Sequence, residues 1–198
     1  MTAGSHPVHE AEERDGFRFR GGHRALDLTA TLRGRSRPIP QELLGTPEDL
    51  GRWLAAAGMG PAPAASREDL NTARALREAI YTLSSHLNAP QAQAEEARAT
   101  LNRIAAGAAA VPVLRDDAGF SLVGDAGMLL VTLAREAVQL LGGAGASQIR
   151  QCQSPACTIF FVDTSRKGDR RWCSMAACGN KAKVAEFRRR RGAGAGTS

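Results

Sequence analysis

Aromatic residues are scarce in this chain, and long apolar runs are missing altogether. Phe, Trp and Tyr make up 5% of the residues, whereas hydrophobic residues make up 43%. A core built largely from Ala, Leu and Val favours helices over sheets. No apolar run reaches the ~18 residues that a membrane-spanning helix needs, and the polar stretch 1–16 lacks the apolar segment of a secretory signal. We therefore expect a mainly α-helical, cytoplasmic protein without a membrane span.

Catalytic motifs are also absent. The sequence shows no paired carboxylates, no Ser/His/Asp set and no Gly-x-Ser-x-Gly turn. His23 and Asp27 are four residues apart and could pair on a helix, but no nucleophile accompanies them. The glycine-rich stretch 142–147 lacks the lysine of a phosphate-binding loop. We expect that the protein is not an enzyme.

Cysteine is rare, but it is concentrated in one place. The chain has four cysteines, and all of them lie between positions 152 and 178 as two Cys-x4-Cys pairs. In a reducing compartment such a cluster is more often a metal site than a pair of disulfides. Two such pairs can place four thiolates around one Zn²⁺ ion, and four thiolates leave no open coordination position. The spacing therefore predicts one structural zinc ion, held by Cys152, Cys157, Cys173 and Cys178.

Positive charge is concentrated in the same region. The chain carries a net charge of +6, and residues 151–191 alone, with ten Lys or Arg and three acids, carry +7. A basic appendage on a nearly neutral body points to a polyanionic partner. The alternative is a solubilising basic tail. The predicted nucleic-acid contacts are Arg166, Lys167, Arg170, Arg171, Lys181, Lys183, Arg188, Arg189, Arg190 and Arg191.

The rest of the chain shows the periodic pattern of amphipathic helices. Thr46 with Pro47, Ser66 with Asp69, and Asp125 are helix-start signals. The helix that begins after Asp125 is apolar nearly all round, so we expect it at the centre of a bundle. The expected elements are a short helix at 24–32, a loop at 33–40, helices at about 47–57, 66–87, 91–106 and 126–141, and a small β-hairpin at 111–123.

The cysteine window predicts a treble-clef-like zinc finger. Residues 158–163 have strand propensity, 164–171 have turn chemistry, and Trp172 and Cys173 would lie on the return strand. A helix would follow Cys178, held down by Val184 and Phe187. Trp172 is expected to pack over the metal site rather than stack on a base, and Asn180 to hydrogen-bond the turn. The predicted organisation is a disordered tail (1–16), a helical domain (17–145), the finger (150–191) and a flexible tail (192–198).

Three short motifs accompany the cysteines: Phe-Phe-Val-Asp-Thr-Ser-Arg (160–166), Arg-Arg-Trp-Cys-Ser-Met (170–175) and Cys-Gly-Asn (178–180). Together with the Cys-x4-Cys pairs they resemble the CGNR zinc-finger family of bacterial proteins. Lys181 stands where the family name has Arg, which keeps the charge but not the bidentate geometry.

The resemblance implies an N-terminal helical domain called ABATE, whose members are described as stress-responsive transcription regulators. The order and length of the chain fit this arrangement. The first motif of that domain is usually closer to Leu-Asp-Phe-Val-Asn-Thr. This chain has Leu-Asp-Leu-Thr-Ala-Thr at 26–31, without the Asn.

We therefore expect a bacterial regulator whose zinc finger binds DNA and whose helical domain senses a small-molecule effector or forms a homodimer. Two alternatives remain open. One is an RNA-binding protein that uses the same basic surface. The other is a protein-interaction or small-molecule-binding module in which the zinc is purely structural.

Overall fold

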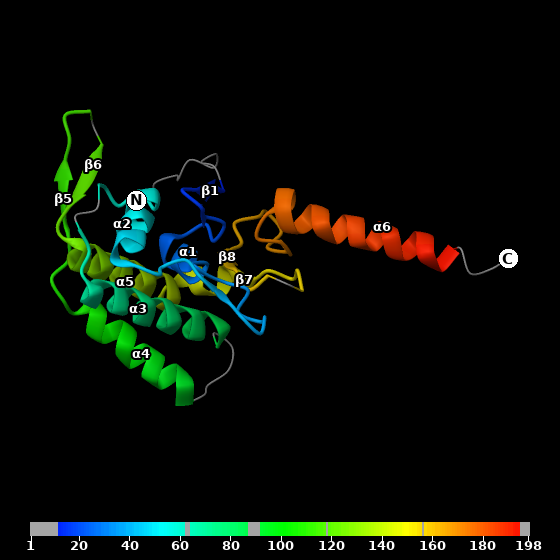
Figure 1. The fold of residues 1–198 in the computed structure, drawn as a ribbon, viewed down its shortest axis with the longest axis horizontal. Coiled ribbons are helices and arrows are strands. Elements are labelled where there is room, and N and C mark those ends of the chain that lie inside the picture. The colour runs from blue at the N-terminus through cyan, green and yellow to red at the C-terminus, as the bar shows by residue number, and fades with distance from the viewer. Residues whose placement is uncertain (1–11, 62–63, 87–91, 118, 156, 195–198) are drawn as a thin grey trace.

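A computed structural model describes residues 12–61, 64–86, 92–117, 119–155 and 157–194. The fold is mainly α, with small antiparallel strand pairs (Figure 1). The helices are α1 (Arg24–Thr29), α2 (Pro47–Ala56), α3 (Arg67–Ser85), α4 (Ala92–Ala105), α5 (Ala126–Gly142) and α6 (Asn180–Gly194), with a 3-10 turn η1 (Ala144–Gln148) and a π turn η2 (Met175–Gly179). The strand pairs are β1 (Glu13–Arg14) with β2 (Phe17–Arg18), β3 (Leu32–Arg33) with β4 (Gln41–Glu42), β5 (Val111–Leu114) with β6 (Phe120–Val123), and β7 (Ile149–Gln151) with β8 (Phe160–Val162).

The predicted helix starts are confirmed. Thr46 and Asp49 form a reciprocal capping box at the start of α2, with Pro47 at the first helical position. Ser66 and Asp69 form the same box at the start of α3. The Asp125 carboxylate accepts the Met128 N–H at 2.8 Å and so caps α5.

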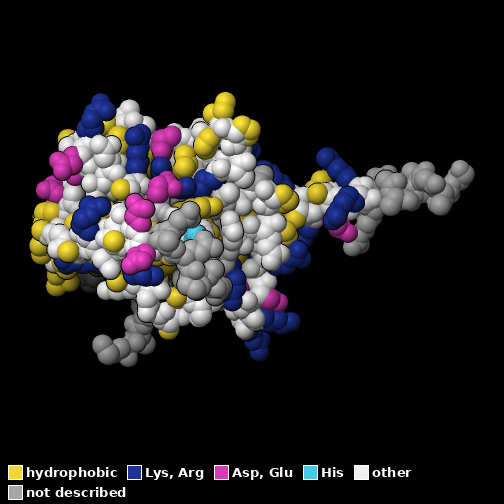
Figure 2. All heavy atoms as spheres, turned by 90° about the horizontal axis from the view of Figure 1, so that it is seen from below, with side chains coloured by type: hydrophobic (Ala, Val, Ile, Leu, Met, Phe, Trp, Pro, Cys, Tyr) yellow, Lys and Arg dark blue, Asp and Glu magenta, His cyan; other side chains and the backbone are white. Residues whose placement is uncertain are grey.

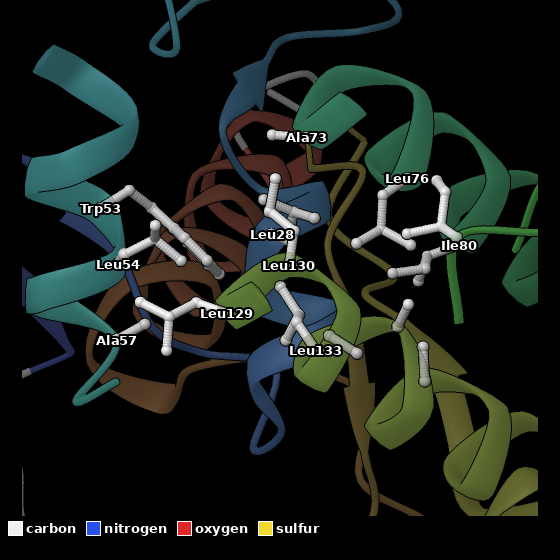
Figure 3. Close-up of a cluster of buried hydrophobic side chains, with 14 of the residues drawn as sticks. Leu28, Trp53, Leu54, Ala57, Ala73, Leu76, Ile80, Leu129, Leu130 and Leu133 are labelled. Atoms are coloured by element: carbon white, nitrogen blue, oxygen red, sulfur yellow. The ribbon is translucent and has the colours of Figure 1, made fainter. Parts of the chain in front are cut away.

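Helix α5 lies at the centre of the bundle, as its composition predicts. It packs against α1, α2, α3 and α4. Leu130 and Leu133 of α5 meet Trp53 of α2 and Ile80 of α3, and all four side chains are fully buried (Figure 3). Trp53 stacks on Phe19 with ring centroids 6.2 Å apart. One of the few aromatic pairs in the chain therefore joins the N-terminal segment to the core.

Short strand pairs appear in two stretches that were expected to be irregular. Strand β1 lies inside the predicted disordered tail, where Arg52 forms an ion pair with Asp15 (Nε–Oδ2, 2.8 Å). The helix predicted over 24–32 ends at Thr29, and its chain continues into β3, which pairs with β4 across the predicted loop. The Thr29 and Thr31 hydroxyls donate to carbonyls three residues earlier, at 2.6 and 2.7 Å. Such bonds compete with helix continuation.

Strand β8 joins the helical body to the cysteine region. Its alternating side chains face two clusters, because successive residues of a strand point to opposite sides. Phe160 belongs to the core of the body, and Phe161 packs with the cysteines. The Val162 N–H donates to the Gly21 carbonyl at 2.9 Å, beside α1. The cysteine region is therefore packed on the body and shares a strand with its core.

No helix in the described part of the chain is long and apolar enough to cross a membrane.

Candidate metal centre and basic surface

The first cysteine pair lies in the turn between β7 and β8. The Cys152 N–H donates to the Ile159 carbonyl at 2.9 Å and extends the ladder of these strands by one bond. The Cys157 N–H donates to the Ser154 carbonyl at 2.8 Å and closes a tight turn. Pairing of β7 with β8 therefore brings both thiols to one end of the hairpin.

The second cysteine pair flanks the π turn η2. Ser174 is the N-cap of this turn: its hydroxyl accepts the Ala177 N–H at 3.1 Å, and its carbonyl accepts the Cys178 N–H at 3.0 Å. Cys173 directly precedes the cap, and Cys178 lies in the turn just before α6. The last ligand is thus at the start of the helix, as predicted.

The four sulfur atoms have the geometry of a tetrahedral zinc site. They all lie within 4.8 Å of one another, and the Cys157–Cys173 and Cys173–Cys178 sulfurs are both 3.8 Å apart. Sulfurs about 2.3 Å from a zinc ion in a tetrahedron lie about 3.8 Å from one another. A disulfide would need about 2.05 Å, and all four cysteines are free. The donor set therefore fits one structural Zn²⁺ ion.

The crowded thiols also influence one another's protonation. Hydrogen bonds from Cys157 and Cys173 lower the pKa of Cys152 to about 2. The same interaction with Cys152 raises the pKa of Cys157 to about 12. Zinc binds cysteine in the thiolate form, so its binding to these four cysteines releases protons.

The predicted return strand at 172–173 is wrong. In the described residues β8 pairs with β7, and the segment after it is a loop closed by Asp163. The buried Asp163 carboxylate accepts the N–H groups of Ser165 and Arg170, both at 2.9 Å. The hydrogen bond with Ser165 lowers the pKa of Asp163 below its usual range. The Arg170 guanidinium donates to the Trp172 carbonyl at 2.8 Å. The side chains of Asp163 and Arg170 therefore hold the backbone of this loop, which has no strand pairing.

Two residues expected to support the site do so. Trp172 is partly buried against the cysteine cluster, which confirms packing rather than exposure for base stacking. Asn180 donates to the Ala176 carbonyl at 3.3 Å. A Cβ at position 179 would lie 2.8 Å from the Met175 sulfur and 3.3 Å from Trp172, so a larger residue there would displace the Met175 side chain.

The ten predicted nucleic-acid contacts differ in how far they are free to bind a partner. Arg170 and Arg171 are used internally: besides the Trp172 bond, Arg170 donates to the Cys173 carbonyl, and Arg171 donates to Gln153 Oε1 at 2.7 Å. Arg189 forms an ion pair with Glu186. The side chains of Arg190 and Arg191 lie outside the described residues. The cationic side chains that are exposed and form no ion pair with a described residue are Arg166, Lys167, Lys181, Lys183 and Arg188.

Helix α6 projects away from the body (Figures 1 and 2). The prediction that Val184 and Phe187 pin it down is wrong, since these side chains are 49% and 59% exposed. The main contact of α6 is with η2. The helix direction is therefore set at its first turn, where Cys178 would bind the metal.

A contact from the N-terminal segment, which sequence reasoning missed, supports the second cysteine pair. The buried Ser174 hydroxyl donates to Glu12 Oε2 at 2.7 Å. Arg20 lies 3.2 Å from the same carboxylate oxygen. The cap of η2 is thus held by the body. Ser before a helical run is a cap signal, but nothing in the sequence links it to a carboxylate 162 positions away.

His23 and Asp27 both stabilise the start of α1 and the turn before it. The His23 ring caps α1 by accepting the Ala25 N–H at 3.2 Å. The buried Asp27 carboxylate accepts the Gly21 N–H at 2.7 Å, and burial raises the pKa of Asp27 to about 7. Because the Gly21 carbonyl accepts from Val162, Asp27 holds the turn on which β8 rests.

Fold and site together define a helical domain joined to a four-cysteine zinc finger. Comparison with protein families gives the same division. Residues 22–144 match ABATE, described as a "putative stress-induced transcription regulator", and residues 148–191 match the CGNR zinc finger. The chain belongs to the ABATE family and carries a CGNR zinc finger. A search of curated proteins found no match.

Proposed function

We propose that the protein is a transcription regulator whose zinc finger binds DNA through the exposed cations of α6 and of the loop 164–170. One observation carries this proposal. Helix α6 leaves the metal centre at a fixed direction and stands clear of the body, with Lys181, Lys183 and Arg188 exposed along it. A basic helix anchored at one end is suited to contact phosphates.

The loop supplies a second cationic group. Arg166 and Lys167 are exposed at its tip, where Gly168 adopts a positive φ of 64° and allows the tight turn. The internal bonds of Arg170 and Asp163 hold this tip in place. These cations would contact phosphates and position the finger, whereas Lys181, near the start of α6, is best placed to reach a base edge.

Zinc has a structural role in this proposal. Its four thiolates would fix β8 relative to the start of α6 and leave no position open for substrate or water. Closed coordination of this kind supports a zinc ion that is not itself catalytic. The description of the ABATE family as a "putative stress-induced transcription regulator" supports the regulatory part of the proposal.

The direct test is binding of labelled duplex DNA, structured RNA and single strands by the zinc-loaded chain at two salt concentrations. We expect duplex DNA to bind most tightly, with affinity that falls steeply as salt rises. Tighter binding of structured RNA would favour the RNA-binding alternative. Absence of binding to any of the three at low salt would overturn the proposal.

A matched pair of double variants locates the surface. Lys181→Gln with Arg188→Gln removes two cations from α6 and should weaken DNA binding by about tenfold or more and lower the salt slope by roughly two. Arg67→Gln with Arg103→Gln makes the same change in net charge on the body, and both side chains are exposed. Equal loss in the two variants would show that net charge, and not α6, governs binding.

A further inference from the structure

The stretch Phe-Arg-Phe-Arg (17–20) alternates apolar and cationic side chains. Phe17 is buried in the core of the body, and Phe19 packs against the same core. Successive residues of a strand point to opposite sides, so Arg18 points away from that core. Glu13 lies opposite Arg18 in the pair β1–β2, and side chains that lie opposite each other share a side. The hairpin β1–β2 therefore has an apolar side against the body and a charged side that carries Arg18 and Glu13.

This hairpin, together with the residue before it, lies against the zinc finger. The Ser174 hydroxyl, beside the second cysteine pair, donates to Glu12 Oε2 at 2.7 Å. The Phe19 N–H donates to the Glu12 carbonyl at 2.9 Å, which continues the ladder of β1 and β2 and holds Glu12 on the hairpin. On the charged side, Cys157 lies close enough to Arg18 for the two side chains to interact electrostatically. The hairpin thus lies beside both cysteine pairs.

Arg18 is a partly buried cation with little negative charge around it. It forms no hydrogen bond or ion pair with a described residue, and its Nε is buried without a hydrogen-bond partner. Burial, and after it the neighbouring cations Arg33 and Arg20, lower the pKa of Arg18, whereas Glu13 and Cys157 act in the opposite direction. The Glu13 carboxylate lies 3.5 Å from Arg33 and is half exposed, so water screens its charge. A stronger anion beside Arg18 would stabilise this arrangement.

The zinc centre is an anion of this kind. Four thiolates around one Zn²⁺ ion carry a net charge of about −2. Cys157, the cysteine beside Arg18, is partly exposed, whereas the other three cysteines are buried. Arg170 of the finger donates to the carbonyls of Trp172 and Cys173 and is engaged there. The body therefore supplies a cation at the side of the cluster where Cys157 lies.

We propose that Arg18 is the counter-charge of the zinc centre, and that the helical body thereby helps the finger to retain its metal. Arg18 is not a ligand in this proposal. It stabilises the ionised form of the thiolates, that of Cys157 above all, and so acts through them on the metal. Removal of such outer partners of a metal site typically weakens metal binding 10–100-fold.

Competition between the chain and a chelator of known zinc affinity, without nucleic acid, tests the proposal. Arg18→Met removes the charge but keeps a long unbranched side chain, and it should raise the zinc dissociation constant about tenfold. Arg18→Lys keeps the charge and should bind zinc nearly as tightly as the unchanged protein, because Arg18 forms no bidentate contact for a lysine to lose. The control is Arg67→Met, which makes the same change in net charge at an exposed position of α3 and should leave the constant unchanged.

A spectroscopic readout separates charge from shape. A cation beside a thiolate stabilises the sulfur lone pairs and raises the energy of thiolate-to-metal charge transfer. In the cobalt-substituted protein, this band should therefore move to longer wavelength in Arg18→Met but not in Arg18→Lys or Arg67→Met.

Equal zinc dissociation constants in Arg18→Met and Arg67→Met would overturn the proposal. So would Arg18→Lys binding zinc as weakly as Arg18→Met, since the charge would then have no role. Arg18→Gln allows the same comparison where the methionine variant does not fold. The result is independent of DNA binding, since no nucleic acid is present.

Discussion

The helical body and the zinc finger of this protein are stabilised in different ways. In the body, side chains from four helices meet around α5, and residues such as Trp53 and Leu130 have no exposed surface. In the finger, the buried apolar residues beside the cysteines are few, chiefly Ile159 and Phe161. Backbone N–H groups that donate to Asp163 and Ser174, together with the four sulfurs, provide the rest of the stabilisation. The stability of the body should therefore depend mainly on its buried apolar side chains. The stability of the finger should depend mainly on the metal ion and on hydrogen bonds.

Loss of zinc should have the largest effect, and it should be confined to the finger. Structural zinc sites contribute about 10–16 kcal/mol of apparent binding free energy, which is also folding free energy. Cys173→Ser should abolish stoichiometric zinc binding and remove amide hydrogen-exchange protection from 164–179 and α6, while α3 and α5 stay protected. Ser154→Ala, in the same turn as Cys152, should retain one zinc per chain. Unchanged protection of the finger without metal would contradict this account.

A cavity in the body should have the next largest effect. Leu130→Ala removes a fully buried side chain at the centre of the bundle and should lower the free energy of unfolding by about 2–5 kcal/mol in urea titrations. Val138→Ala shortens a side chain of the same helix that is 38% exposed, and should cost less than about 1 kcal/mol. Both variants should bind one zinc ion at 25 °C. Zinc loss in folded Leu130→Ala would show that the two regions are less separate than proposed.

The buried carboxyl of Asp27 should make the body sensitive to pH. Its pKa is raised to about 7 in the folded protein, so the folded state holds a proton that the unfolded state releases near pH 4. The stability contributed by Asp27 therefore falls as pH rises from about 4 to 7 and then levels off. The free energy of unfolding of Asp27→Asn does not include this loss. Relative to the unchanged protein, the variant should therefore become more stable by about 2 kcal/mol as the pH is raised from 5 to 8. Denaturation of the zinc-loaded proteins measures this difference, with Asp116→Asn on an exposed loop expected to show none.

The contact between the regions should give the smallest effect. Glu12→Ala removes the acceptor of the Ser174 hydroxyl and should cost about 1 kcal/mol, since Glu12 is half exposed. Zinc transfer to a chelator should become about fivefold faster, with little change in the unfolding of the body. Glu13→Ala removes the neighbouring carboxylate, which contacts Arg33 at 3.5 Å, and should leave the rate unchanged. Equal acceleration in both variants would argue against a specific role for Glu12.

The parts of the structure that could be predicted from the sequence are those set by local chemistry. The capping residues Thr46, Ser66 and Asp125 define helix starts within a few residues, and the two Cys-x4-Cys pairs define the metal site. The central position of α5 follows from its apolar composition. Each of these predictions depends on side chains close together in the chain or on a donor set with one preferred geometry.

The parts that could not be predicted depend on contacts between distant segments. The partner of β8 is β7, because Asp163 and Arg170 use their hydrogen bonds to close the loop that was expected to lead into a return strand. Val184 and Phe187 are exposed because α6 points away from the body. That direction is set by the turn before the helix and not by the sequence of α6 itself. An Asp followed by Thr and Ser is a turn signal that could have indicated the loop closure. The predicted small-molecule effector and the DNA target remain predictions.

The two faces of β8 have a consequence for anyone who divides this protein for expression. Phe160 completes the core of the body, and Phe161 completes the cysteine cluster. A cut between residues 145 and 148, which the family boundaries invite, would leave the body without Phe160 and the finger with that ring exposed. Both fragments should aggregate. A fragment that ends after Asp163 keeps Phe160 in the core of the body. Changing Phe161 to a polar residue in this fragment removes the apolar ring that would otherwise be exposed.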